Sequence, residues 1–234
     1  DVFKKYQAAQ NLLEVTRDTE KLVREAQAEV DRAKETLTVK AQTLKKVRVA
    51  AAPKLCDAVT EQMSHLQMGS AQIELNFEDL PFEQWNKVGS TKIELMYKPS
   101  AQMTARPLRK IASGGEVSRV MLACKVVLGE SDVCDTLVFD EVDAGVGGAT
   151  AVALAEVLAQ LAKTHQVIVV THLPQVAVMA SKQYVVSKTE EHNALPITSL
   201  TEVSGIQREE EIARMLSGSI TEASLAHAHE LLYP

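Results

Sequence analysis

A short apolar run in the second half of the chain ends abruptly in a pair of acids. Residues 137–139 are Leu-Val-Phe, and Asp140 and Glu141 follow directly. The run predicts a buried parallel strand, and open α/β sheets bind ligands at the carboxyl ends of their strands. Two carboxylates there suit Mg²⁺ and an attacking water beside a phosphate. As neighbours on a strand end, their side chains should diverge. The alternative is that these residues form a strand followed by a solvated acidic turn.

A glycine pair that opens a predicted helix lies upstream of the acids. Ser113, Gly114 and Gly115 precede an apolar helix expected over residues 117–128. Glycines allow close approach of the backbone to a ligand, and a helix N-terminus presents N–H groups with a partial positive charge. With the serine hydroxyl, this is a good contact for a phosphate. The alternative is an ordinary serine N-cap with a glycine turn.

A histidine follows the next predicted buried strand. The strand is expected over residues 167–170, and Thr171 and His172 come after it. The carboxyl ends of neighbouring parallel strands share one edge of a sheet. We therefore expect His172 to point into the same crevice as Asp140 and Glu141, although a lone histidine is more often structural.

Helical and strand patterns alternate around these residues. Residues 73–77 and 93–97 alternate apolar and polar side chains, which predicts two strands. After Pro107, helices and strands alternate, with the predicted helices at 149–162, 173–180, 209–216 and 222–232 and further strands at 184–186 and 197–203. This order predicts an α/β fold with a mostly parallel sheet covered by helices.

The first 52 residues differ from the rest, because they contain neither proline nor glycine. Val23, Val30, Leu37 and Leu44 recur at seven-residue spacing, which predicts a coiled-coil arm. The alternative is a single amphipathic helix on a domain surface. Pro53 marks a boundary, with a second helix expected over residues 55–66. The predicted domains are therefore the arm, 1–52, and an α/β domain, 53–234.

Composition narrows the class of protein. The chain has 234 residues, of which 46% are hydrophobic, so it can form a substantial core. The net charge of −6 argues against a surface that binds nucleic acid over its whole extent, although not against a local basic patch. No apolar run is long enough for a membrane span, and three cysteines without metal spacing suit reduced thiols in a cytoplasmic protein. The candidate basic residues for DNA are Lys45, Lys46, Arg48, Arg106, Arg109 and Lys110.

Taken together, these stretches resemble the signature motif, Walker B motif, D-loop and switch histidine of ABC-type ATPases. The predicted arm resembles the SMC-like branch. Four stretches are similar to the RecN family of bacterial DNA-repair proteins: IASGGEVSRVMLACK, LVFDEVDAGVGG, VIVVTHLPQVA and EEIARMLSG. The likeness covers residues 105–234. Ala112 and Glu116 stand where transporters usually carry leucine and glutamine, which favours RecN over transporters.

The resemblance implies a role for each candidate residue. Asp140 would bind Mg²⁺, Glu141 would act on the attacking water, and His172 would sense the γ-phosphate of ATP. Asp143 would communicate across an interface between two heads. Ser113 and Gly115 would close over the γ-phosphate of ATP held by the other head, and Gly114 and Glu116 are further candidate nucleotide-binding residues.

No Gly-x-x-x-x-Gly-Lys-Ser/Thr loop occurs in the sequence. In the SMC-like family this Walker A loop lies in an N-terminal lobe, beyond the coiled coil. We therefore expect the chain to be the C-terminal half of a head plus the root of its arm, inactive alone. Its expected partners are that lobe, a second head in an ATP-dependent homodimer, and DNA, with no membrane partner.

The implied function is ATP hydrolysis that drives tethering of DNA in double-strand-break repair and recombination, in the bacterial cytoplasm at the nucleoid. Two alternatives remain open. One is a structural, cohesin-like clamp in which ATP mainly gates head closure. The other, more distant, is the nucleotide-binding subunit of an ABC transporter, which would lack the arm.

Overall fold

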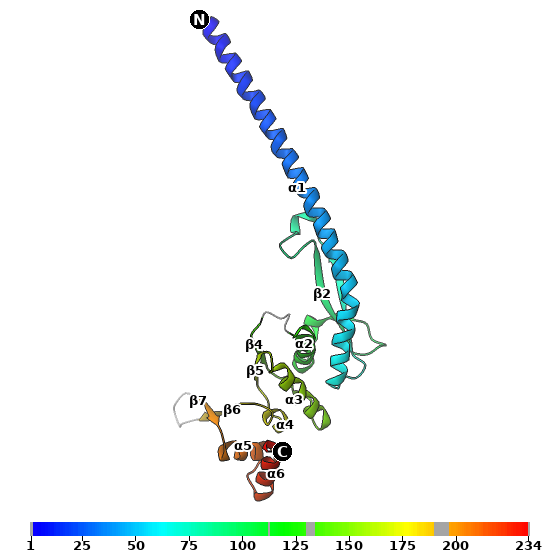
Figure 1. Cartoon of the computed structure of the whole chain (residues 1–234), viewed down its shortest axis with the longest axis vertical. Coiled ribbons are helices and arrows are strands. Elements are labelled where there is room, and N and C mark those ends of the chain that lie inside the picture. The colour runs from blue at the N-terminus through cyan, green and yellow to red at the C-terminus, as the bar shows by residue number, and fades with distance from the viewer. Residues whose placement is uncertain (1, 112, 130–133, 190–196, 234) are drawn as a thin grey trace. The chain divides into compact units, whose positions relative to one another are not determined.

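The computed structural model describes residues 2–111, 113–129, 134–189 and 197–233. The chain groups into two compact units. Figure 1 shows the ribbon of the whole chain, coloured from the N-terminus to the C-terminus. The helix–hairpin unit comprises Asp1–Ala52 and Asn76–Ile93, and the α/β unit comprises Pro53–Leu75 and Glu94–Pro234. Residues 76–93 thus group with the N-terminal helix, whereas the sequence prediction placed them in the α/β domain. Ala112 lies outside the described residues.

The first element is the helix α1, Val2–His65. The sequence predicted a break at Pro53, and this prediction is wrong, because the helix continues through that residue. A proline removes one backbone N–H from the ladder, and helix formation is cooperative. Long stretches of strong helix formers on both sides of Pro53 outweigh that local cost. The heptad residues Val23, Val30 and Leu37 are exposed, so the apolar stripe of the predicted coiled coil is available to another helix.

The hairpin segment is attached to α1 within the helix–hairpin unit. The strands β1, Gln72–Asp79, and β2, Thr91–Lys98, flank a short 3₁₀ helix, Phe82–Gln84. Lys45 Nζ lies 2.6 Å from both carboxylate oxygens of Asp79. Arg48 donates to the carbonyl oxygen of Val88 at 2.8 Å. Two of the candidate DNA-binding cations therefore hold the hairpin on its helix, a use that the sequence prediction missed.

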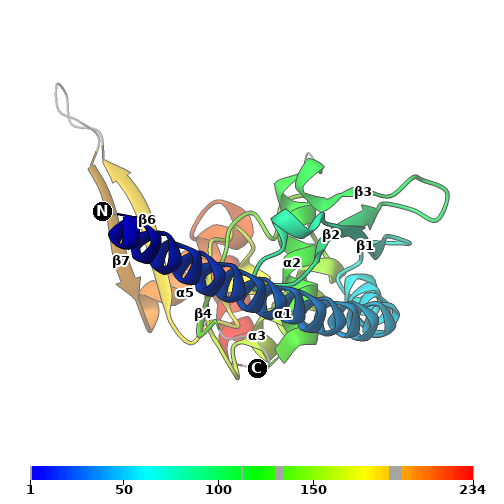
Figure 2. The ribbon, with the colours of Figure 1, turned by 90° about the horizontal axis from the view of Figure 1, so that it is seen from above.

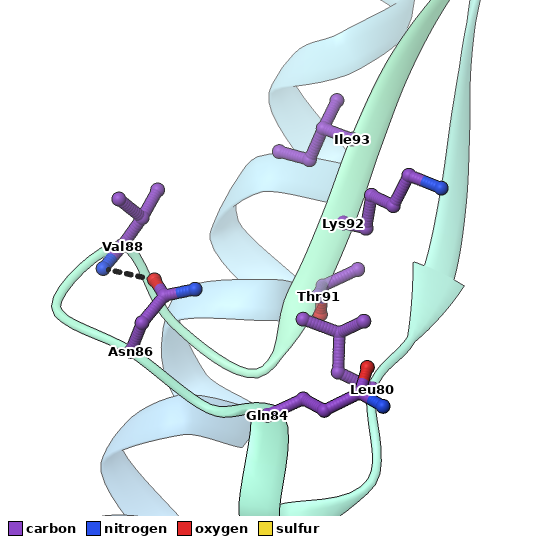
Figure 3. A pocket seen from close by; sticks show the side chains of 7 residues that line it. All are labelled: Leu80, Gln84, Asn86, Val88, Thr91, Lys92 and Ile93. Atoms are coloured by element: carbon purple, nitrogen blue, oxygen red, sulfur yellow. Dashed lines mark hydrogen bonds between the residues drawn. The ribbon is translucent and has the colours of Figure 1, made fainter.

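A pocket of about 520 Å³ lies in the turns of this hairpin, and Figure 3 shows its lining. The Asn86 side chain accepts a hydrogen bond from the Val88 amide at 2.8 Å, which shapes one wall. The charged residue in the lining, Lys92, lies 3.4 Å from Glu78. The lining carries no pair of groups suited to acid–base or metal chemistry. We therefore place the functional site in the other unit.

The α/β unit is built around the strands β4, Thr136–Phe139, and β5, Gln166–Val169. They pair in parallel with the helix α3, Ala149–Leu161, between them in sequence. The helix α2, Gly114–Leu128, also packs into this core. The buried side chains are mainly aliphatic, as the low aromatic content requires, and include Val120, Leu122, Leu137, Phe139, Leu154 and Leu158.

Two further strand pairs are antiparallel. A short strand β3, Arg106–Pro107, pairs with β2, and β6, Gln183–Thr189, pairs with β7, Ile197–Val203 (Figure 2). The strands β4 and β5 form the parallel pair described above. The predicted α/β class is confirmed, but the parallel part is smaller than expected, because β2 and β3, and β6 and β7, pair in antiparallel fashion.

The helices α4, Pro174–Ala177, α5, Ile206–Ser217, and α6, Glu222–Leu232, complete the unit. Part of their apolar surface forms a second, smaller core of Ala177, Ile212, Ala213 and Ala228. Over the parts of the chain that the structure covers, no helix has the length and apolar content needed to cross a membrane.

Candidate functional site

The acid pair lies where the sequence predicted it, directly after β4. The strand ends at Phe139, and the amide of Val170 donates to the Phe139 carbonyl at 2.9 Å, which continues the parallel ladder to its carboxyl edge. Asp140 is exposed just beyond this edge. A carboxylate in that position is open to solvent and to a ligand.

Glu141 has a backbone conformation that the sequence did not reveal. Its φ angle is +56°, in the left-handed region that is uncommon for residues other than glycine. Its carbonyl oxygen accepts from the amide of Ala144 at 3.0 Å, so the chain turns at once. The prediction that the two acids diverge by strand alternation does not apply, because the strand has already ended. Such a conformation costs roughly 1 kcal/mol or more, and it is retained where the surroundings hold it.

The glycine pair lies against this turn. A Cβ atom added to Gly114 would lie 2.4 Å from Oε2 of Glu141. A Cβ atom added to Gly115 would lie 2.9 Å from the Ala144 Cβ and 3.1 Å from the backbone oxygens of Ala144 and Glu141. The glycines therefore allow α2 to approach the acidic turn and bring its N-terminus beside the Glu141 carboxylate. The positive end of the helix dipole favours a negative charge there.

Ser113 is the N-cap of α2. Its Oγ accepts from the backbone amide of Glu116 at 3.3 Å, which is the ordinary capping role that the sequence left open. Glu116 lies in the first turn of α2 near Tyr97. Burial raises the pKa of the Tyr97 hydroxyl, and the Glu116 carboxylate raises it further. Both Ser113 and Gly114 are exposed, so the start of α2 is open to a ligand.

Two side chains of α2 that the sequence analysis missed hold the acidic turn. Ser118 Oγ donates to the carbonyl oxygen of Asp140 at 2.9 Å. Arg119 Nη1 donates to the carbonyl oxygens of Val142 and Ala144, at 3.2 and 2.9 Å. The sequence offered one indication of this role. Both residues lie one turn after the glycines, on the face of α2 that approaches the acidic turn.

Asp143 links the two strand ends. It is only 3% exposed, and its Oδ2 accepts from the Thr171 hydroxyl at 2.5 Å and from the His172 amide at 3.0 Å. The His172 Nδ1 lies 3.2 Å from the same oxygen. These donors compensate the cost of burying a carboxylate. Thr171 was not predicted as a site residue, although a hydroxyl directly after a buried strand was visible in the sequence.

His172 is therefore held by its ring and by its backbone. A proton on Nδ1 that faces Asp143 leaves Nε2 as the acceptor nitrogen. The side chain is 70% exposed, so the ring lies at the open edge of the sheet. The structure brings His172 together with Asp143, whereas the sequence had predicted only a shared crevice with Asp140 and Glu141.

Asp140 suits a magnesium ion only when other ligands come from elsewhere. Over the described ranges, no group of three or more His, Cys, Asp and Glu side chains could hold a metal ion. Mg²⁺ often takes one or two protein carboxylates and completes its shell with waters and phosphate oxygens. One exposed carboxylate fits that mode. The chain has no phosphate-cradling lysine loop, so its residues supply one part of a nucleotide site.

A methyl group at Gly115 is expected to destabilise the fold more than one at Gly114. The Gly115 methyl would meet backbone atoms that cannot rotate away, whereas the Gly114 methyl would meet the mobile end of a carboxylate side chain. We expect Gly115→Ala to lower the free energy of unfolding by about 1–3 kcal/mol. Gly114→Ala should change it by about 0.5 kcal/mol or less. Urea denaturation of both variants measures this difference, and equal midpoints would contradict the close approach of α2.

Comparisons with known proteins show which proteins the chain is similar to. No family model matches the chain. It is 41% identical over 226 residues to the DNA repair protein RecN of Deinococcus radiodurans, covering 97% of this chain and 39% of that protein. It is 39% identical over 216 residues to the DNA repair protein RecN of Streptomyces coelicolor, covering 88% of this chain and 38% of that protein. The chain thus spans about two fifths of the length of these curated relatives.

A solved structure shares the fold. The Smc head domain with a coiled coil and joint from Pyrococcus yayanosii superposes with a TM-score of 0.56 at 19% identity. The match covers 88% of this chain and 36% of that one. The chain therefore shares its fold with part of that head domain.

Proposed function

The chain is a homologue of the RecN proteins over most of its own length, and from this premise we propose that it forms part of an ATPase head. The whole protein hydrolyses ATP with Mg²⁺ and uses the cycle to tether DNA during double-strand-break repair and recombination. It works in the bacterial cytoplasm at the nucleoid, without a membrane partner. The contact of Asp143 with His172 carries most of this proposal, because it joins the ends of β4 and β5 into one site.

Each site residue takes a role that suits its surroundings. Asp140, exposed at the end of β4, contributes a ligand for Mg²⁺, which when bound supplies positive charge at the phosphates. Glu141 orients or deprotonates the attacking water. His172 faces the γ-phosphate while Asp143 holds its ring. Catalysis consists of positioning and electrostatics, with little covalent chemistry by the protein.

The exposed N-terminus of α2 contacts the nucleotide of the partner head. This N-terminus and the cap serine suit a phosphate held by another molecule. In a homodimer of heads, this end of α2 closes over ATP bound to the Walker A loop of the opposite head. The contributing residues are Ser113, Gly114, Gly115 and Glu116. Asp143 transmits the state of the interface to His172, since it touches that residue directly.

A clamp that uses ATP mainly to gate closure is the second candidate. The exposed heptad stripe of α1 is compatible with it, because an arm that pairs with another helix serves a clamp as well as a motor. The two functions differ in whether DNA controls turnover. The transporter alternative receives no support from the homologues, which are DNA-repair proteins.

The test is ATP hydrolysis by the full-length protein with and without linear double-stranded DNA. The tethering ATPase predicts Mg²⁺-dependent turnover that rises with DNA. A slow rate that DNA leaves unchanged would favour the clamp, and the absence of any hydrolysis would contradict both. This chain alone serves as a control, and we expect no appreciable turnover from it, because it lacks the phosphate-cradling loop.

A further inference from the structure

A single arginine binds the end of the segment that follows His172. Arg208 lies in the first turn of α5 and is half-buried. Its Nη2 lies 3.1 Å from the carbonyl oxygen of Ala177, 3.2 Å from that of Val178 and 2.7 Å from that of Ala180. Its Nε donates to the side-chain oxygen of Gln183 at 3.2 Å. One guanidinium group thus gathers four acceptors from the end of α4 and the start of β6.

The arginine is stabilised at this position by its contacts with α4 and not by the helix α5 to which it belongs. A positive charge in the first turn of a helix is opposed by that helix's dipole. The last carbonyl groups of a helix lack intrahelical partners and carry partial negative charge. Arg208 supplies donors to those carbonyls at the end of α4, across a long separation in sequence.

The helix α4 needs such support, because it has only four residues, Pro174–Ala177. A single turn is not stable by propensity alone. It is held on one side by burial of Val176 in the main core and on the other by Ala177, which packs with Ile212 and Ala213 of α5. Arg208 adds hydrogen bonds to this second contact. Figure 1 shows α4 and α5 close to each other.

The other end of the same segment is held by Asp143. The amide and ring of His172 both contact its carboxylate, and α4 begins two residues later. The short segment between His172 and Ala180 is therefore fastened at its start by Asp143 and at its end by Arg208. Without the contacts of Arg208, α4 would be held by its apolar contacts alone at the end of the segment that begins at His172.

We propose that Arg208 is a positioning residue for His172, acting through α4, and that it links α5 to the γ-phosphate-sensing edge of the sheet. The effect on catalysis rests on the proposed ATPase function, whereas the effect on the position of His172 does not. Two measurements on the full-length protein separate these claims.

The first measurement is hydrogen–deuterium exchange without nucleotide. Arg208→Gln removes the guanidinium group and leaves a shorter, uncharged polar side chain. We expect amides in residues 171–180 to exchange roughly 10-fold faster, because their opening becomes easier when charged hydrogen bonds are lost. Arg214→Gln is the matched control, since Arg214 lies on the same helix and pairs only locally, with Glu211 at 2.7 Å. Unchanged exchange over residues 171–180 in Arg208→Gln would overturn the proposal.

The second measurement is a double-mutant cycle in ATP hydrolysis. Arg208→Gln should lower kcat roughly 10-fold, because a misplaced catalytic group loses its alignment, while KM stays within about twofold. In a His172→Gln background the same substitution should cause no further loss. A purely structural role would lower activity equally in both backgrounds, and that result would overturn the proposal.

Arg208→Lys is the third variant. It tests the positioning role of Arg208 if Arg208→Gln does not fold. A lysine keeps the charge but cannot contact all four acceptors at once. We expect exchange and kcat between those of the parent and of Arg208→Gln, and parental values for both would overturn the proposal. A parent protein without ATPase activity would contradict the proposed function alone, because the exchange measurement would still test the role of Arg208.

Discussion

Replacing Glu141 by glutamine is expected to lower ATP hydrolysis by the full-length protein roughly 100-fold or more, in line with loss of a positioned base. Glutamine keeps the size of the side chain and its contact with Gly114 but removes the basic carboxylate. The left-handed backbone at this position is no harder for glutamine than for glutamate. The fold should therefore be retained, and the loss should be confined to the chemical step. ATP and Mg²⁺ should still bind, because Asp140 is unchanged.

ATP binding, hydrolysis and dimer mass should be measured together for this variant and for Asp140→Asn. Binding without turnover predicts that Glu141→Gln accumulates closed head dimers in ATP. Asp140→Asn should instead weaken the Mg²⁺ site and reduce nucleotide occupancy. If Glu141→Gln hydrolysed ATP at the parental rate, or lost ATP binding as Asp140→Asn does, the division of roles between the two acids would be wrong.

Replacing Ser113 by arginine is expected to abolish ATP-dependent head pairing while nucleotide binding to a single head stays nearly intact. Ser113 is exposed at the start of α2, where we place the phosphate held by the opposite head. A bulky cation there obstructs the interface and lies at the positive end of the helix dipole. Light scattering with and without ATP measures the dimer, and fluorescence titration with nucleotide measures binding to the single head.

The matched control is Ser113→Ala, because both substitutions remove the N-cap hydroxyl that accepts from Glu116. Loss of this cap costs about 1 kcal/mol of stability in either variant. Only the arginine adds bulk and charge, so only Ser113→Arg should prevent pairing completely. Normal ATP-dependent dimers of Ser113→Arg would show that α2 does not face the second head.

The sequence by itself determined the local elements and their order. The apolar run before Asp140 predicted β4, the run before Thr171 predicted β5, and the glycines predicted the start of α2. Strand propensity, helix capping and the effect of glycine act over a few residues, so they can be read from neighbouring letters. For the same reason, the residues of the site were found at the carboxyl edge of the β4–β5 pair, while their roles stay predictions.

The course of the chain between these elements was decided by the tertiary structure. Proline at position 53 predicted a break, but the helix formers on both sides carry α1 through it. Lys45 and Arg48 were candidates for DNA, yet both bind the hairpin, at Asp79 and Val88, which lie 34 and 40 residues later in the chain. Partners so far apart cannot be assigned from spacing, because the chain reversal between them sets which side chains meet.

The contacts that assemble the site also join residues that lie far apart in the sequence. Asp143 meets Thr171 and His172 because β4 and β5 pack in the main core, and Arg208 meets the end of α4 because α4 and α5 pack in the second, smaller core. The left-handed turn at Glu141 likewise depends on the glycine start of α2 lying against it. Residue types and short-range propensity determined which groups are available for chemistry. Long-range packing decided which of them touch, since that depends on the path of the whole chain and not on any local stretch.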